Sequence, residues 1–143
     1  MNLTRALKEK NKLVGKIKVL WERLISSNQS LSDKQDYNAE DLYTQIESET
    51  DKLLKLKQLI NTATQPIFPD IQLIAELKGR MTNLKSIQTE EKKATYSDNI
   101  ITYNVQMNKN RVDELIDKTT KEIENIQDRI DQFNVSGNID WEP

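Results

Sequence analysis

Hydrophobic residues recur along most of this chain at alternating spacings of three and four positions, the pattern of helices that pack along a narrow seam. The first such segment covers residues 3–31, and the second begins near Asn38 and ends by about Gln65. A third segment fades near Ala94, and a fourth covers residues 112–133. The pattern predicts an all-α protein with four long amphipathic helices.

The expected seams occupy the a and d positions of one heptad frame in each segment. In the first segment these positions hold Leu3, Leu7, Lys10, Val14, Ile17, Trp21, Leu24, Asn28 and Leu31. In the second they hold Ala39, Leu42, Ile46, Glu49, Leu53, Leu56, Ile60 and Ala63. In the third and fourth they hold Ile74, Leu77, Met81, Leu84, Val112, Ile116, Thr119, Ile123, Ile126, Ile130 and Phe133. We expect Trp21 to pack in the core, and the polar Asn28 and Glu49 to fix the register or lie at a solvated end of the bundle.

Polar stretches separate the segments. Residues 30–37 have no period and predict a loop, while Asn38 and Asp70 are placed to cap the second and third helices. Between the third and fourth helices, residues 101–107 alternate apolar and polar positions, which is also the pattern of a short strand. The surrounding helices favour an irregular connector there.

Short connections between long helices favour antiparallel neighbours. We therefore expect an antiparallel coiled-coil-like bundle of four long helices, either up-down-up-down or as paired hairpins. Residues 1–134 are expected to form this single domain, and residues 135–143 a C-terminal tail held, if at all, by Ile139 and Trp141. Additional apolar residues widen the apolar faces of the first and third predicted helices. These wider faces favour a homo-oligomer over a monomeric bundle. They are Leu13, Leu20, Ile25, Leu73 and Ile87.

The composition suits such helices and excludes many activities. Of the 143 residues 31% are charged and 6% aromatic, with only three glycines and three prolines, so the turn-rich composition of an all-β protein is missing. The net charge of −2 gives no reason for the whole molecule to bind nucleic acid. The chain has no cysteine and no histidine, which removes thiolate nucleophiles and the commonest general base. We expect a non-enzymatic protein without a cofactor.

The sequence also gives no reason to expect a metal centre or a membrane span. Carboxylate-bridged metal sites in helical bundles use a Glu-x-x-His motif, which this chain cannot supply. An acidic cluster around the second helix start matches no calcium-binding loop; its members are Asp33, Asp36, Glu40 and Asp41. Because the first residues lack the apolar core of a signal peptide and no long apolar run follows, a cytoplasmic protein is expected.

The first segment is locally basic, with seven Lys and Arg against two Glu within residues 1–25. Such a helix is suited to contact anions or an anionic lipid surface. The candidate residues are Arg5, Lys8, Lys12 and Lys16. The alternative is that these cations pair with the acidic residues of the second and fourth helices.

Three stretches carry a resemblance to a known family. They are Asn2-Leu3-Thr4-Arg5-Ala6-Leu7, Leu59-Ile60-Asn61-Thr62-Ala63-Thr64, and the last segment from Val112-Asp113-Glu114-Leu115 through Arg129-Ile130. In their order along nearly the whole chain they resemble the septicolysin-like family of small bacterial helical proteins of unknown function. The resemblance implies a helical architecture and a cytolysin label, but it assigns no site residues. The inserted stretch before Trp141, residues 135–138, departs from the family pattern.

Two hypotheses for function follow. The first is a self-associating helical scaffold or interaction protein without enzymatic activity. The alternative is a membrane-active, cytolysin-like protein that uses its basic first helix.

Overall fold

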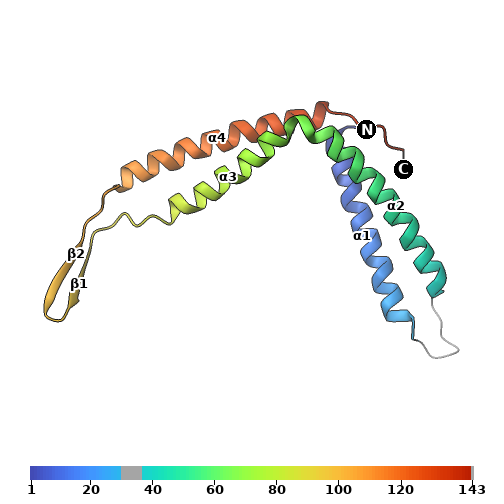
Figure 1. The fold of residues 1–143 in the computed structure, drawn as a ribbon, viewed down its shortest axis with the longest axis horizontal. Coiled ribbons are helices and arrows are strands. Elements are labelled where there is room, and N and C mark those ends of the chain that lie inside the picture. The colour runs from blue at the N-terminus through green and yellow to red at the C-terminus, as the bar shows by residue number, and fades with distance from the viewer. Residues whose placement is uncertain (30–36, 143) are drawn as a thin grey trace. The chain divides into compact units, whose positions relative to one another are not determined.

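The computed structural model describes residues 1–29 and 37–142 and is mostly helical, as predicted (Figure 1). The elements in order are α1 (Leu3–Ser27), α2 (Ala39–Thr64), the short 3₁₀ helix η1 (Gln65–Ile67), α3 (Phe68–Lys85), β1 (Lys92–Tyr96), β2 (Asn99–Tyr103) and α4 (Lys109–Ser136). The expected loop at residues 30–37 lies mainly outside the described residues.

The chain divides into two compact units. Unit 1 comprises Met1–Pro66 and Gln132–Pro143, and unit 2 comprises Ile67–Asp131. The long helix α4 contributes its first part to unit 2 and its last part to unit 1. Each unit is described by itself.

Three of the four α-helices begin at an asparagine that caps the first turn. The Oδ1 atoms of Asn2, Asn38 and Asn108 accept hydrogen bonds from the backbone amide three residues further on, at 2.8, 3.1 and 2.9 Å. Each of these bonds satisfies an amide that has no partner within the helix. The predicted cap at Asn38 is confirmed.

In unit 1, α1 and α2 form an antiparallel pair with the expected seam on α2. Its predicted positions are all buried or half-buried; the most buried are Leu42, Ile46, Glu49, Leu56 and Ile60. On α1 the prediction holds in part: Leu3 is buried and Leu7, Lys10, Ile17 and Leu24 are half-buried, whereas Val14, Trp21 and Asn28 are exposed. The other buried residues of α1 are Ala6, Leu13 and Leu20. Leu13 and Leu20, predicted as flanking residues, therefore form the interface with α2.

The residues after α4 are part of the unit 1 core. Ile139 is buried among Leu3, Ala6 and Leu56, with Trp141 packed against the same cluster. The backbone amide of Ile139 donates to the carbonyl of Met1 at 2.8 Å. The anchoring role predicted for Ile139 and Trp141 is thus observed.

In unit 2, α3 begins differently from the prediction. Asp70 is not the cap: Ile67 occupies that position without a side-chain hydrogen bond, and Pro69 lies at the start of the helix. Asp70 instead lies in the first turn, where a carboxylate interacts favourably with the helix dipole. It accepts two hydrogen bonds from Arg129 of α4, from Nη2 at 2.9 Å and from Nε at 3.2 Å. This bidentate ion pair joins α3 to the part of α4 that belongs to unit 2.

The connector between α3 and α4 contains a β-hairpin, so the expectation of an irregular segment over residues 101–107 was wrong for 101–103, which lie in β2. Residues 104–107 form no helix or strand, as expected. β1 and β2 pair antiparallel from Lys92 opposite Tyr103 to Tyr96 opposite Asn99. Helix α3 ends at Lys85, and Ala94 lies in β1, so the third helix is shorter than its sequence pattern predicts. Within unit 2, Figure 1 shows the hairpin extending beyond the ends of α3 and α4.

Candidate functional site

The hairpin carries a concentration of exposed apolar side chains. Tyr96 and Ile100 are 72% and 73% exposed, Tyr103 is 59% exposed, and Ile101 is 41% exposed. We call these four residues the hairpin surface. By the register, Tyr96, Ile101 and Tyr103 share one face of the hairpin and Ile100 lies on the other. An isolated two-stranded hairpin is at best marginally stable in water, and grouped exposed apolar side chains mark interaction sites. The hairpin surface is therefore a candidate for contact with a partner.

A cleft of about 510 Å³ lies at the base of the hairpin. Its apolar lining comes from Ile87, Tyr103, Val105 and Met107, and the polar residues that also line it are Gln88, Glu90, Lys92, Asn104 and Gln106. Tyr103 belongs to both the cleft and the hairpin surface, so the two form one continuous feature of unit 2. A cleft with such an apolar lining suits an apolar side chain of a partner.

The turn of the hairpin fixes its register. Ser97 and Asp98 both have positive φ, at 47° and 66°. A two-residue turn with positive φ at both positions is a type I′ turn, whose twist matches that of the flanking strands. Neither residue is glycine, which this turn ordinarily prefers, so the hairpin forms with some local strain.

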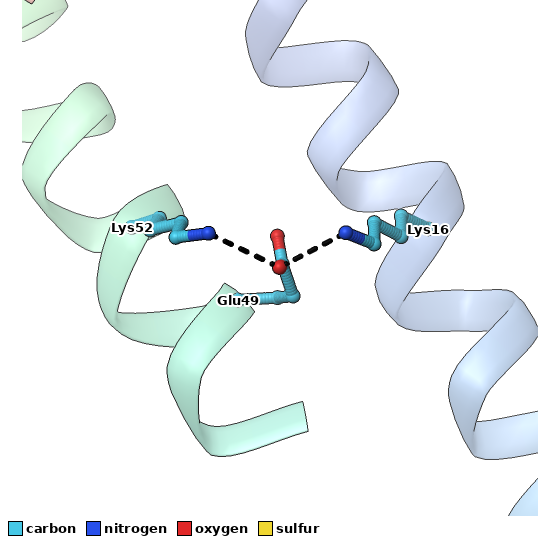
Figure 2. Close-up of polar contacts among 3 residues, drawn as sticks. All are labelled: Lys16, Glu49 and Lys52. Atoms are coloured by element: carbon cyan, nitrogen blue, oxygen red, sulfur yellow. Dashed lines mark hydrogen bonds and ion pairs between the residues drawn. The ribbon is translucent and has the colours of Figure 1, made fainter. Parts of the chain in front are cut away.

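A second feature is the buried carboxylate of Glu49 in the seam of α2, between Lys16 of α1 and Lys52 of its own helix (Figure 2). The Nζ atoms of Lys16 and Lys52 donate to Glu49 Oε1 at 3.0 and 3.3 Å. The hydrogen bond from Lys16, opposed by burial and supported by Lys52, lowers the pKa of Glu49 below its ordinary value. Glu49 is thus a charged seam residue neutralised from both helices, and it links α1 to α2.

A smaller cleft of about 310 Å³ adjoins this ion cluster. Its lining comprises Glu9, Lys12, Leu13, Lys16, Glu49, Lys52 and Trp141. Three lysines are offset by two glutamates, and each lysine lies within 4 Å of one of these carboxylates. The cleft therefore offers an incoming anion little uncompensated positive charge.

The four basic residues predicted from sequence separate into two groups. Lys16 pairs with Glu49, and Lys12 lies 3.7 Å from Glu9. Arg5 and Lys8 are exposed, and neither lies within ion-pair distance of a carboxylate in the part of the chain that the structure describes. The apolar row of α1 that holds Leu13 and Leu20 packs against α2, whereas Val14, Val19, Trp21 and Ile25 remain exposed. The alternative prediction was that these cations pair with acidic residues of neighbouring helices, and Lys16 does so with Glu49 of α2.

The other polar and aromatic positions singled out by the sequence are structural. Asn28 is exposed and forms the C-terminal cap of α1, its amide donating to the carbonyl of Leu24. Trp21 was expected in the core; it lies at the edge of the α1–α2 pair instead, with its ring edge-on to Tyr43 at 6.3 Å between centroids.

The acidic cluster predicted near the start of α2 is only partly described. Asp33 and Asp36 lie outside the described residues, while Glu40 and Asp41 occupy the first turn of α2. Among residues 1–29 and 37–142, no three acidic side chains are grouped so as to hold a metal ion. Across the same residues, no helix is both long and apolar enough to cross a membrane.

The hairpin surface and its cleft were missed by the sequence reasoning. The signal was present as the alternation at Ile101, Tyr103, Val105 and Met107, but its partner strand, residues 92–96, carries two lysines and one alanine and shows weak alternation. The turn residues Ser97 and Asp98 also lack the asparagine-glycine pair that marks type I′ hairpins.

The chain matches no protein-family model, no curated protein and no solved structure. The resemblance to the septicolysin-like family remains a prediction, and the proposals below rest on the geometry of the described residues.

Proposed function

We propose that this protein is a non-enzymatic, self-associating interaction protein in which coiled-coil-like helix pairs form the scaffold and the hairpin of unit 2 binds a second copy. The observation that carries the proposal is the hairpin surface. Three of its four side chains, Tyr96, Ile100 and Tyr103, are more than half exposed on an element that two strands alone stabilise poorly. Covering them with another copy removes apolar surface from water and stabilises the hairpin.

Exposed apolar residues on α3 support the same conclusion. Phe68, Ile71 and Leu73 are each more than a third exposed, which leaves apolar surface on unit 2 beyond the hairpin. Each apolar group of this size contributes on the order of 1 kcal/mol or more when buried. A homo-oligomer is therefore the assembly that we propose for this chain.

The ionisable groups support a non-enzymatic role. The groups with shifted pKa values include Glu49, Asp70 and Arg129, and in each the largest cause is a hydrogen bond to an oppositely charged partner. An acid or base poised for catalysis is usually perturbed by burial in a cleft and left accessible to substrate. Glu49 thus belongs to a structural ion cluster with Lys16 and Lys52, and Asp70 forms a structural ion pair with Arg129.

The test is the absolute mass in solution, measured by size-exclusion chromatography with light scattering at two protein concentrations and two salt levels. We expect a stable multiple of 16.7 kDa. The variant Tyr96→Thr/Ile100→Thr/Tyr103→Thr keeps strand-forming residues while removing the apolar groups, and it should be a monomer.

Ile25→Thr is the matched control for this measurement. Ile25 is 75% exposed on α1, against 73% for Ile100, but lies outside the hairpin. The sequence pattern placed Ile25 among the residues that favour a homo-oligomer. Because the proposal assigns the contact to the hairpin instead, Ile25→Thr should leave the mass unchanged. A wild-type protein that is monomeric at all concentrations contradicts the proposed function.

A further inference from the structure

We propose that two copies of this chain join through the outer edge of β2, each strand pairing antiparallel with its counterpart about Ile101 to give a four-stranded sheet. This inference rests on the proposed self-association and specifies the strand edge at which the two copies join, next to Ile100 and Tyr103 of β2 and one strand away from Tyr96 of β1. It follows from the register of the hairpin, the distribution of charge on its strands and the symmetry of the resulting pair.

The register identifies which backbone groups face outward. The residues that flank a two-residue turn, Tyr96 and Asn99, form a hydrogen-bonded pair, and such pairs alternate along an antiparallel ladder. Ala94 and Ile101 are then the next hydrogen-bonded pair. Thr95 opposite Ile100, and Lys93 opposite Thr102, are the pairs whose amide and carbonyl groups point away from the partner strand. In the described part of the chain the sheet has two strands, so Ile100 and Thr102 present these groups at an open edge.

The two open edges differ in how they are protected. Natural edge strands carry lysines, prolines or bulges that prevent pairing with another chain. β1 has Lys92 and Lys93, whereas β2 has the sequence Asn-Ile-Ile-Thr-Tyr, with no charge and no proline, and its register is regular. The edge of β2 is therefore the one suited to accept a further strand.

β2 is complementary to itself in one register that uses the whole strand. Pairing about Ile101 sets Ile100 opposite Thr102 of the second copy and Thr102 opposite its Ile100, so all the outward backbone groups of these two residues meet partners. Asn99 lies opposite Tyr103 of the second copy, and no like charges oppose each other. The two Ile101 side chains, each 41% exposed in one copy, would meet at the two-fold axis.

The symmetry of this contact also limits its size. A pairing of β2 with β2 is two-fold and closed, and it leaves a β1 strand with its lysines at each outer edge of the four-stranded sheet. A pairing of β1 with β2 would instead repeat from copy to copy without closing. Sheets of three or more strands with an apolar face are independently stable, which a single hairpin is not. A second copy is thus an occupant that both completes the sheet and ends its growth.

The first experiment uses the absence of cysteine from the natural chain. In an antiparallel pair that is not hydrogen-bonded, opposing Cα atoms lie about 4.5 Å apart, within the range that a disulfide spans. Ile101→Cys should therefore form a disulfide-linked dimer under mild oxidation at least tenfold faster than Ile25→Cys, which has an exposed thiol away from the hairpin. Equal rates would overturn the proposed pairing.

The second experiment places a lysine on each edge in turn and measures mass by light scattering. Thr102→Lys protects the β2 edge and should give a monomer, while Thr95→Lys, on the already protected β1 edge, should leave the oligomer intact. Circular dichroism checks that both variants keep their helices. An oligomer that persists in Thr102→Lys overturns the edge pairing.

The outcomes distinguish this inference from the proposed function. A wild-type oligomer with neither rapid crosslinking nor sensitivity to Thr102→Lys overturns the β2 contact and leaves self-association standing. A wild-type monomer overturns both. A monomer that floats with vesicles of phosphatidylcholine and phosphatidylserine, and loses this binding in the Tyr96→Thr/Ile100→Thr/Tyr103→Thr variant, assigns the hairpin surface to lipid instead.

Discussion

The backbone amide of Leu3 donates to the carbonyl of Gly137 at 2.9 Å, joining the first turn of α1 to the residue that follows α4. At this point the two chain segments approach so closely that a Cβ atom on Gly137 would lie 2.7 Å from Leu3 Cδ1 and 3.0 Å from the carbonyl oxygen of Phe133. The glycine is required by this close approach, since no glycine in the described chain has a positive φ. The contact holds the residues after α4 in the core of unit 1.

Gly137→Ala is therefore expected to destabilise the protein by about 1–3 kcal/mol, the usual cost of forcing extra volume into a packed site. Leu3 is fully buried and the Phe133 oxygen belongs to the backbone, so neither neighbour can move freely. Chemical denaturation followed by circular dichroism measures the free energy of unfolding.

Gly15→Ala and Gly79→Ala are the controls for this substitution. Both glycines lie inside helices, and a Cβ atom at either position meets nothing within 4 Å. Alanine there should stabilise the protein by about 0.5–1 kcal/mol, because it favours the helix and restricts the unfolded chain. A loss of stability at Gly15 or Gly79 equal to that at Gly137 would contradict the close-approach argument.

Glu49 provides a second prediction, about the cost of a charge in a helix seam. Glu49→Gln weakens the hydrogen bonds from Lys16 and Lys52 and keeps a polar group buried, so it should reduce the free energy of unfolding by about 1 kcal/mol. Glu49→Leu extends the apolar row of α2 and releases both lysines, which are about half exposed, to solvent. It should be neutral or stabilising, as for other replacements of buried ion pairs. Equal losses in both variants, measured by urea denaturation, would contradict this expectation.

The lowered pKa values of Glu49 and Asp70 predict a dependence of stability on pH. Lys16 lowers the pKa of Glu49 below its ordinary value near 4.5, and Arg129 lowers the pKa of Asp70 below its ordinary value near 3.8. In this range the unfolded chain binds more protons than the folded one, so stability falls as the pH falls. The contribution of Glu49 to the free energy of unfolding should be complete above about pH 5 and decline below it. The contribution of Asp70 should decline at lower pH.

The measurement is urea denaturation at pH values from 7 to 3, comparing the wild type with Glu49→Gln and Asp70→Asn. Each variant should lack its own part of the acid-dependent loss, and Glu49→Gln should do so at the higher pH. A wild-type curve that both variants reproduce without change would show that these carboxylates do not govern the acid dependence.

The basic face of α1 gives a prediction about lipid. An amphipathic helix binds a membrane surface through a free apolar face together with its positive charges. Here the row of Leu13 and Leu20 faces α2, so that only its neighbours such as Val14 and Trp21 are exposed, and Lys16 is neutralised by Glu49. We expect that replacing Arg5, Lys8 and Lys12 with Gln leaves the flotation of the protein with anionic vesicles unchanged. Replacing Lys18, Lys55 and Lys57 with Gln is the control of equal charge. A loss of flotation specific to the first variant would favour the membrane-active alternative.

The helices could be predicted from sequence more closely than the faces they bury. On α2 and α4 the predicted seam positions are all buried or half-buried, although apolar residues such as Tyr43, Leu54 and Leu115 lie outside the frame. On α1 the apolar residues cover three adjacent rows, and the position of the partner helix decides which rows are buried. The row of Leu13 and Leu20 faces α2, and the neighbouring row of Val14 and Trp21 does not. Sequence periodicity alone contains no information about this choice.

The candidate site could be predicted less well, because it depends on contacts between strands. A hairpin gains its stability from pairing across the turn, and the two strands here have dissimilar sequences, one with Lys92 and Lys93 and the other with Ile100 and Ile101. The ion pairs of Glu49 with Lys16 and of Asp70 with Arg129 likewise join positions 33 and 59 residues apart. The polar character of Glu49 in the seam was visible in the sequence, but its partners were not.

The turn of the hairpin supports a last prediction, about local stability. Asp98 has a φ of 66°, a conformation that glycine adopts without strain and a β-branched residue does not. Asp98→Gly should stabilise the hairpin by about 1 kcal/mol, which slows hydrogen exchange at the amides of Ala94 and Ile101 about fivefold. Asp98→Val should speed this exchange. Both are best measured by NMR in the Thr102→Lys background, so that pairing between copies does not contribute. If exchange is the same in the Gly and Val variants, the turn does not control the hairpin, and the strain assigned to it is wrong.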